Sequence, residues 1–219
     1  GAKIDTIIFD LGGVLVDWKP EYLYRKIFGD EQKVQWFLKT ICTSKWNAEQ
    51  DAGRTIAEAN SIKIAEFPEY QKEIRQFYER WEEMFSGPIL QNVELFRELT
   101  ASKKYKIYAL TNWSAEKWDK ALELFPFFKD FDGVVVSGQE KTRKPNPEIY
   151  NILLNRYHIT PENAIFIDDN KENIIFWIFD YYSIYSLCGK KGTCNFSESS
   201  KICGASPRTG THCTSRSYP

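Results

Sequence analysis

The sequence lacks the features of a membrane protein or a nucleic-acid-binding protein. No stretch approaches the ~18 consecutive apolar residues that a membrane-spanning helix requires, and no charged-then-apolar leader opens the chain. The formal net charge is -1 and no long block of Lys or Arg is present, so the basic surface expected of a nucleic-acid-binding protein is missing. We therefore expect no membrane association, no nucleic-acid partner and a cytoplasmic location.

Cysteine is scarce in most of the chain. Of the 5 cysteines in 219 residues, only Cys42 lies before residue 188, and the other four are near the end: Cys188, Cys194, Cys203 and Cys213. A chain so poor in cysteine is typical of a reducing compartment. The late cysteines also lack the closely spaced pairs of a zinc site.

Four short apolar runs are each followed by turn residues, and helical patterns lie between them. The runs cover residues 4–9, 105–110, 134–136 and 164–167. Short buried strands alternating with helices are typical of a parallel sheet covered on both faces. Ser114 is a candidate N-cap of a helix over residues 115–124, and Asn146 precedes Pro147 at the start of another helix.

Residues 19–88 have a different pattern. Helical periodicity continues through this region without a convincing strand, and Gly87-Pro88 is a suitable boundary at its end. The sequence therefore predicts an α/β core formed by residues 1–18 and 89–219, with residues 19–88 inserted as a helical unit.

Polar residues follow all four predicted strands. These are Asp10, then Thr111 and Asn112, then Lys144, and finally Asp168 and Asp169. Ligands of an open parallel sheet bind beyond the carboxyl ends of its strands, so we expect one shared site. A carboxylate can be a nucleophile, a hydroxyl and an amide can hold phosphate oxygens, and a lysine can neutralise both. Adjacent acids at a buried strand end repel each other unless a cation lies there.

Four segments resemble, in order, the motifs of haloacid dehalogenase-like hydrolases. They are FDLGGVL at residues 9–15, LTN at 110–112, KPNPEIY at 144–150 and FIDDN at 166–170. The helical insert resembles the cap of the subgroup that includes sugar-phosphate phosphatases and the phosphatase domain of soluble epoxide hydrolase. The resemblance spans roughly residues 3–174. It implies a Rossmann-like parallel sheet with an inserted helical cap that closes over the site.

The resemblance also implies a role for each polar residue. Asp10 would be the nucleophile and a metal ligand, together with the carbonyl of Gly12 and the carboxylate of Asp169. Asp168 would bind the metal directly or through water. Substrate phosphate would be held by Thr111, Asn112 and Lys144, with Lys144 bridging it to Asp10. Mg²⁺ is the expected ion, because it prefers hard oxygen ligands.

The chain departs from the family pattern at Gly12. Most phosphatases of this family have a second Asp two residues after the nucleophile, as general acid and base. Here glycine occupies that position, so a proton for the leaving group must come from water, from a cap residue, or not at all. We expect a lowered rate rather than lost function.

The segment after residue 174 does not follow the family pattern. A helix of small residues and a last strand would normally follow, but we identify neither. Residues 174–179 are apolar all round, and the sequence from Lys190 is rich in Ser, Gly, Thr and Cys. We interpret the atypical tail, about 175–219, as resembling translation in a shifted reading frame.

These features predict metal-dependent hydrolysis of a small phosphorylated metabolite through an aspartyl-phosphate, by a monomer or homodimer. One alternative is a 2-haloacid dehalogenase using the same Asp10. The resemblance implies that such enzymes need no metal and lack the acidic pair, so Asp168-Asp169 argues against it. The other alternative is a catalytically impaired member that only binds ligand, as Gly12 and the tail would suggest.

Overall fold

A five-stranded parallel sheet is the centre of the molecule. The computed structural model describes residues 3–174 and 184–187. The strand order is β5-β4-β1-β6-β7, and every neighbouring pair is parallel. The strands are β1 (Thr6–Phe9), β4 (Lys106–Thr111), β5 (Gly133–Val136), β6 (Ala164–Asp168) and β7 (Ile184–Leu187). The Rossmann-like sheet predicted from the sequence is therefore confirmed.

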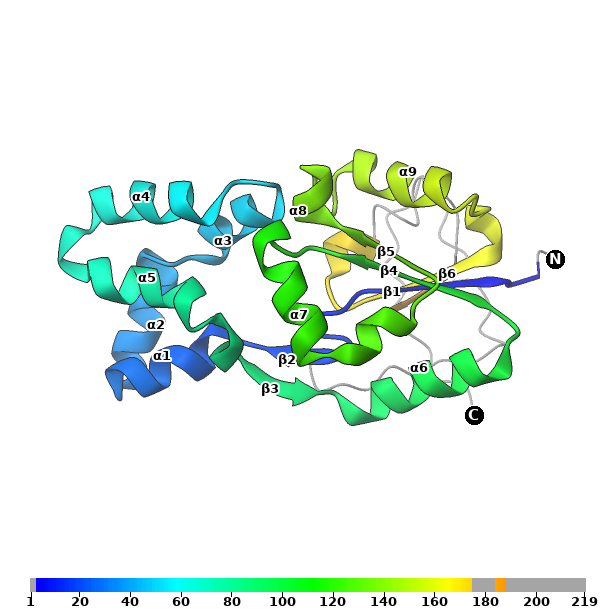
Figure 1. Ribbon diagram of the computed structural model, residues 1–219, viewed down its shortest axis with the longest axis horizontal. Helices are drawn as coiled ribbons and strands as arrows, with labels where there is room; N and C mark the ends of the chain where they lie inside the picture. Colours follow the sequence, from blue (N-terminus) through cyan, green and yellow to red (C-terminus); the bar gives the residue numbers. More distant parts are fainter. Residues whose placement is uncertain (1–2, 175–183, 188–219) are drawn as a thin grey trace, which may run out of the picture.

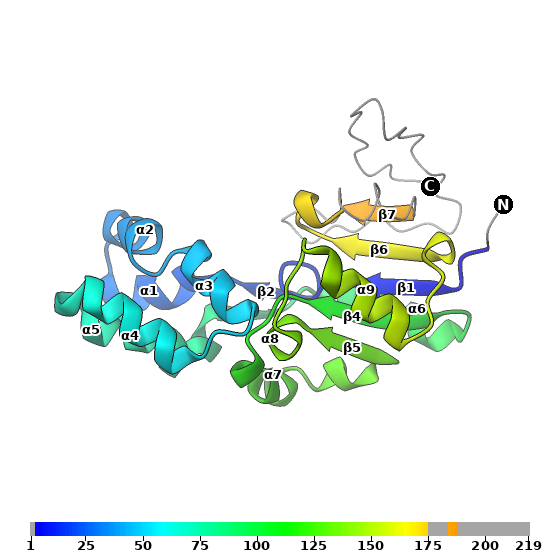
Figure 2. The same ribbon diagram turned by 90° about the horizontal axis from the view of Figure 1, so that it is seen from above.

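The sheet is buried on both faces. Side chains alternate along a strand, so Ile7 and Phe9 of β1 lie in one hydrophobic cluster and Ile8 lies in a second. The first cluster contains Phe96 of α6 (Leu90–Ser102), and the second contains Leu153 of α9 (Pro147–Arg156). Figures 1 and 2 show α6 and α9 on opposite faces of the sheet. This burial explains the nearly continuous apolar strand sequences.

A group of helices lies beyond the carboxyl ends of the strands (Figure 1). It contains α1 (Pro20–Phe28), α2 (Glu31–Thr40), α3 (Ser44–Asp51), α4 (Ile56–Glu66) and α5 (Gln71–Glu79), with the 3₁₀ helices η1 (Pro68–Tyr70) and η2 (Trp81–Met84). We call this group the helical unit. Its interior is aromatic: the Tyr24 and Phe37 ring centroids are 4.6 Å apart, and those of Trp46 and Phe77 are 5.2 Å apart.

Two short antiparallel strands join the helical unit to the sheet. They are β2 (Val16–Trp18) and β3 (Phe85–Pro88). The expectation of no strand within residues 19–88 is therefore wrong at the end of that range. The FSGP sequence of β3 contains glycine and proline, which disfavour strands, so its strand conformation depends on pairing with β2.

Short helices complete the description of the core. They are α7 (Trp118–Leu124), α8 (Ser137–Glu140) and the 3₁₀ helices η3 (Ala115–Lys117), η4 (Pro126–Asp130) and η5 (Pro161–Asn163). Ser114 and Asn146 precede η3 and α9 as expected, but neither side chain makes a capping hydrogen bond. The helix predicted over residues 115–124 is divided into η3 and α7.

The end of the chain corrects one expectation. A last strand was not identified from the sequence, yet β7 pairs in parallel with β6. Residues 175–183 and 188–219, with the four late cysteines and most of the region assigned to a shifted frame, lie outside the described residues. Within the described residues, no helix is long and apolar enough to cross a membrane.

Candidate active site

Three carboxylates meet at the carboxyl ends of β1 and β6. Asp10 follows β1, Asp168 is the last residue of β6, and Asp169 comes next. One oxygen from each lies within 4.8 Å of the others. Asp10 and Asp168 are buried, whereas Asp169 is partly exposed. The parallel pairing of β1 with β6 places the two strand ends side by side, which explains why residues so distant in sequence meet.

The turn after β1 is shaped around these acids. The backbone N–H of Leu11 donates to Asp10 Oδ1 at 2.8 Å, which fixes the carboxylate. Gly13 has a φ of +82°, and a Cβ at this position would overlap the carboxylate of Asp169. A side chain at position 13 would therefore be both strained and obstructed.

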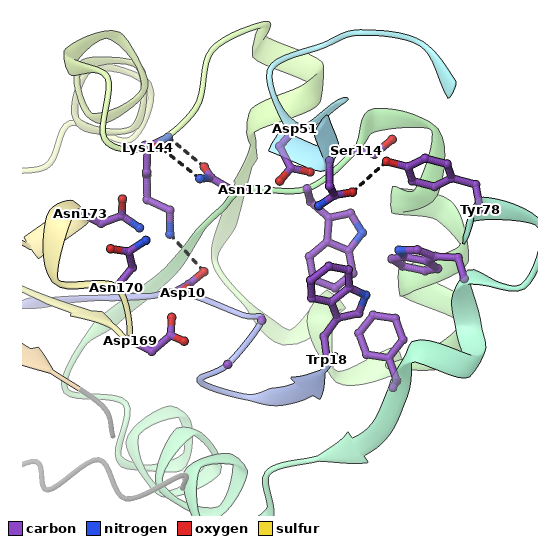
Figure 3. Close-up of a pocket in the computed structure, with 16 residues that line it drawn as sticks. Asp10, Trp18, Asp51, Tyr78, Asn112, Ser114, Lys144, Asp169, Asn170 and Asn173 are labelled. Atoms are coloured by element: carbon purple, nitrogen blue, oxygen red, sulfur yellow. Dashed lines mark hydrogen bonds and ion pairs between the residues drawn. The ribbon is translucent and has the colours of Figure 1, made fainter. Parts of the chain in front are cut away.

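Lys144 is the buried cation of this cluster. Its Nζ donates to Leu110 O and to Asp168 Oδ2, each at 2.7 Å, and forms an ion pair with Asp10 Oδ1 at 3.1 Å (Figure 3). An ammonium has three protons, so two are committed to Leu110 and Asp168. Only the proton facing Asp10 remains for a ligand.

The cluster contains three carboxyl groups and one ammonium group, so negative charge exceeds positive charge. Burial raises the pKa of Asp10 well above its usual value, and repulsion from Asp168 adds to this against the opposing charge of Lys144. Burial and the charge of Asp168 likewise raise the pKa of Asp169. Burial alone would lower the pKa of Lys144, but Asp10 and Asp168 outweigh it and the pKa is raised. A divalent cation would relieve this repulsion.

The two polar residues after β4 differ in their surroundings. Thr111 Oγ1 is buried and has no hydrogen-bond partner among the described residues. Such an atom is costly unless a ligand or water satisfies it. Asn112 instead holds the Lys144 backbone: its Nδ2 donates to Lys144 O at 3.1 Å, and its Oδ1 accepts from Lys144 N at 2.8 Å.

A cavity of about 270 Å³ lies between these strand ends and the helical unit. Its core side includes Asp10, Gly12, Lys144 and Asp169. Its other side is formed by β2, β3 and the helical unit, through Trp18, Asn47, Asp51, Tyr78, Trp81 and Phe85. Asp168 does not line the cavity. Its carboxylate accepts hydrogen bonds from Lys144 Nζ, Asn170 N and Asn173 Nδ2.

The model of the haloacid dehalogenase-like hydrolase family matches residues 4–176. The chain belongs to this family. As a haloacid dehalogenase-like hydrolase it is an enzyme, and the resemblance of its four motifs is thereby confirmed.

Similar proteins agree with this family membership. A phosphorylated carbohydrates phosphatase of Thermotoga maritima is 27% identical over 176 residues, which is 78% of this chain and 79% of the relative. A D-ribitol-5-phosphate phosphatase of Bacteroides thetaiotaomicron is 23% identical over 189 residues, which is 78% of this chain and 85% of the relative.

A similar solved structure supports the fold. A family enzyme of B. thetaiotaomicron, in complex with magnesium and inorganic phosphate, has a TM-score of 0.64 at 23% identity. The similarity covers 85% of this chain and 95% of that one. At this level of identity the likeness supports the fold of the hydrolase alone.

Two cavity residues of the helical unit, Asp51 and Tyr78, were not identified from the sequence. Asp51 and Tyr78 lie in helices whose sequence pattern gives no sign of which polar residue faces the sheet. The position of Asp51 depends on the packing of α3 against α8 across the two parts of the chain. The Asp-Ala-Gly sequence at the end of α3 indicates a turn but no chemistry.

Proposed function

We propose that this enzyme hydrolyses small phosphate monoesters with Mg²⁺, through a phosphoryl group carried on Asp10. The main support is the Asp10 carboxylate at the cavity floor, ion-paired with buried Lys144 at 3.1 Å and grouped with two further acids. A nucleophilic carboxylate with excess negative charge around it suits phosphoryl transfer assisted by a metal.

The residues present fit a magnesium ion. Asp10 and Asp169, with the carbonyl of Gly12, would supply hard oxygen ligands, and Asp168 would act directly or through water. The raised pKa values of Asp10 and Asp169 fit this, because burial and the repulsion from Asp168 both disfavour their charged forms. When bound, the ion would supply charge that neutralises the phosphate and the carboxylates.

The side chains of the chain would then carry the reaction. The Leu11 N–H and the Lys144 ammonium orient the Asp10 carboxylate for in-line attack on phosphorus. Lys144 neutralises the phosphate oxygens, and the unpartnered Thr111 hydroxyl donates to one of them. Asn112 acts mainly by holding the Lys144 backbone. Water then displaces Asp10 from phosphorus and releases inorganic phosphate.

We assign residues 19–88 as a cap that selects the substrate. The helical unit supplies the cavity wall facing the strand ends, so the part of the substrate beyond the phosphate would contact it. A cavity of about 270 Å³ suits a small metabolite. The similarity to phosphatases of phosphorylated carbohydrates and of ribitol phosphate favours a sugar or polyol ester.

Turnover of para-nitrophenyl phosphate tests this function. The wild type should release phosphate in Mg²⁺ and lose that activity in excess chelator. Asp10→Asn should lower kcat by at least about 10³-fold, because an amide cannot attack phosphorus. A panel of sugar phosphates and nucleotides then identifies the natural class of ester.

Two outcomes would contradict the proposal. Equal rates for the wild type and Asp10→Asn would remove Asp10 from the chemistry. Halide release from a 2-chloro acid in excess chelator would instead support dehalogenation by the same carboxylate.

A further inference from the structure

We propose that Asp51, in the helical unit, protonates the leaving-group oxygen and later deprotonates the attacking water, an inference that rests on the proposed phosphatase function. In this role Asp51 is a catalytic residue, and it replaces the acid missing at position 12. The helical unit would then complete the catalytic machinery as well as enclose the substrate.

The core offers no spare acid for the departing oxygen. Among the described residues that line the cavity, the carboxylic acids are Asp10, Asp51 and Asp169. Asp10 and Asp169 belong to the cluster that would hold the metal and attack phosphorus. Gly12 has no side chain, and the Lys144 ammonium has two protons committed to Leu110 and Asp168 and the third facing Asp10. Asp51 is the remaining carboxyl.

The position of Asp51 fits an acid opposite the nucleophile. Asp51 is the last residue of α3, which packs against α8 of the core. Figure 3 shows its carboxyl directed into the cavity from the helical side, with Asp10 and Lys144 on the core side. In-line displacement places the leaving oxygen on the far side of phosphorus from Asp10. That oxygen would point toward the wall to which Asp51 belongs.

The carboxyl of Asp51 has no structural hydrogen bond or ion pair within the described residues. Within residues 3–174 and 184–187, no hydrogen bond or ion pair joins it to another side chain. The neighbouring Tyr78 is different: its hydroxyl donates to Asn47 Oδ1 at 2.8 Å and accepts from Gln50 Nε2 at 2.7 Å. Burial raises the pKa of Tyr78, so the phenol keeps its proton and is a poor acid. Asp51 is free to contact a ligand.

The pKa of Asp51 suits a group that gives and accepts a proton during the reaction. Burial raises its pKa to about 7, against the opposing charges of Arg143 and Lys144. A carboxyl that is partly protonated near neutrality can both give and accept a proton. The charges of Arg143 and Lys144, in the loop after α8, act on Asp51, and Tyr78 of α5 interacts with it electrostatically. In the adjoining segment, Lys141 lies beside Gly53 and Arg54 donates to Gln50.

The two steps balance as follows. Asp10 Oδ forms a bond to phosphorus as the bond from phosphorus to the ester oxygen breaks, and the electron pair of that bond goes to the ester oxygen. This oxygen takes the Asp51 proton and leaves as an alcohol, with Asp51 now a carboxylate. Water then attacks phosphorus and gives one proton to Asp51. The Asp10–phosphorus bond breaks, and Asp10 returns as a carboxylate with inorganic phosphate as product.

Leaving groups of different basicity separate this role from a structural one. The para-nitrophenolate group needs no proton, whereas an alkoxide does. Asp51→Asn should lower kcat/KM at least about 100-fold for the best sugar or polyol phosphate in the panel. It should leave kcat/KM for para-nitrophenyl phosphate within about threefold of wild type, because kcat/KM reports only the steps through leaving-group departure.

The pH profile provides a second readout. For the wild type, kcat/KM for the alkyl ester should fall as pH rises above about 7, as Asp51 loses its proton. That decline should be absent for the aryl ester and from Asp51→Asn. Asp51→Glu should restore part of the alkyl-ester activity. Glu49→Gln, which changes an exposed acid on the same helix, is the matched control and should leave both activities unchanged.

The outcomes distinguish the two proposals. If Asp10-dependent hydrolysis of the aryl ester is absent from the wild type, the phosphatase function itself fails. If that hydrolysis is present but Asp51→Asn lowers kcat/KM equally for both esters, or for neither, Asp51 is not the acid. Wild-type turnover of the aryl ester with none of any alkyl ester would also overturn the inference. Far-ultraviolet circular dichroism and Tm verify that each variant is folded.

Discussion

Gly12 lies two residues after Asp10, where the family resemblance implies an acid, and the structure leaves space for a side chain there. No heavy atom lies within 4 Å of a Cβ built on Gly12, and its φ lies outside the left-handed region. Asp51, on the opposite side of the cavity, is the carboxyl available for the same work. Proton transfer therefore depends on a residue contributed by the helical unit rather than by the turn after β1.

Gly12→Asp should supply a second route for the proton. We expect this substitution to raise kcat/KM for an alkyl phosphate by about tenfold or more in the Asp51→Asn background, because it provides an acid on the core side. Steady-state kinetics on the single and double variants measure the gain. Gly13→Ala is the contrasting control: its Cβ would overlap Asp169, so activity should fall. A Gly12→Asp variant that folds normally but gives no gain would contradict this.

At the scale of secondary structure, α3 connects the stability of the helical unit to the site. Thr43 Oγ1 accepts from Trp46 N at 3.0 Å and caps the helix that carries Asn47 and Asp51. Thr43→Ala should lower the free energy of unfolding by about 1 kcal/mol. It should also lower kcat/KM for the alkyl ester several-fold, because a loosened α3 positions Asp51 less well.

The cap of α2 offers a matched comparison. Asp30 Oδ1 accepts from Gln32 N at 3.1 Å, and α2 contributes no residue to the cavity lining described above. Asp30→Ala should cost a similar amount of stability without changing kcat/KM. Chemical denaturation and steady-state kinetics on both variants test this. Equal losses of activity would mean that α3 has no special connection to catalysis.

The elements of the core could largely be predicted from the sequence. Buried parallel strands have short apolar sequences, so the predicted runs match β1, β4, β5 and β6 within two residues at each end. Three described strands were missed, and they differ from the core strands. β2 has only 3 residues, β3 contains glycine and proline, and β7 follows a segment without a legible pattern. The pairing of β2 with β3 and of β7 with β6 is a tertiary effect that local propensity does not capture.

At the scale of the whole molecule, the site joins segments that are far apart in the chain. The motifs at strand ends could be predicted to meet, because parallel strands align their carboxyl ends at one edge of the sheet. The opposite wall could not be predicted, because which polar residue of α3 or α5 faces the cavity depends on how the helical unit packs on the core. The tail beyond residue 187 lies outside the described residues, and the shifted-frame hypothesis stays a prediction.

Covalent transfer of a phosphoryl group to Asp10 is the central step of the proposed reaction. Intact-mass spectrometry after rapid acid quench tests this most directly, with para-nitrophenyl phosphate and Mg²⁺ in the pre-steady state. The wild-type chain should gain the mass of one phosphoryl group, which fragmentation places on Asp10, and Asp10→Asn should gain none. Rapid turnover with no adduct, or an adduct on another residue, would contradict the account.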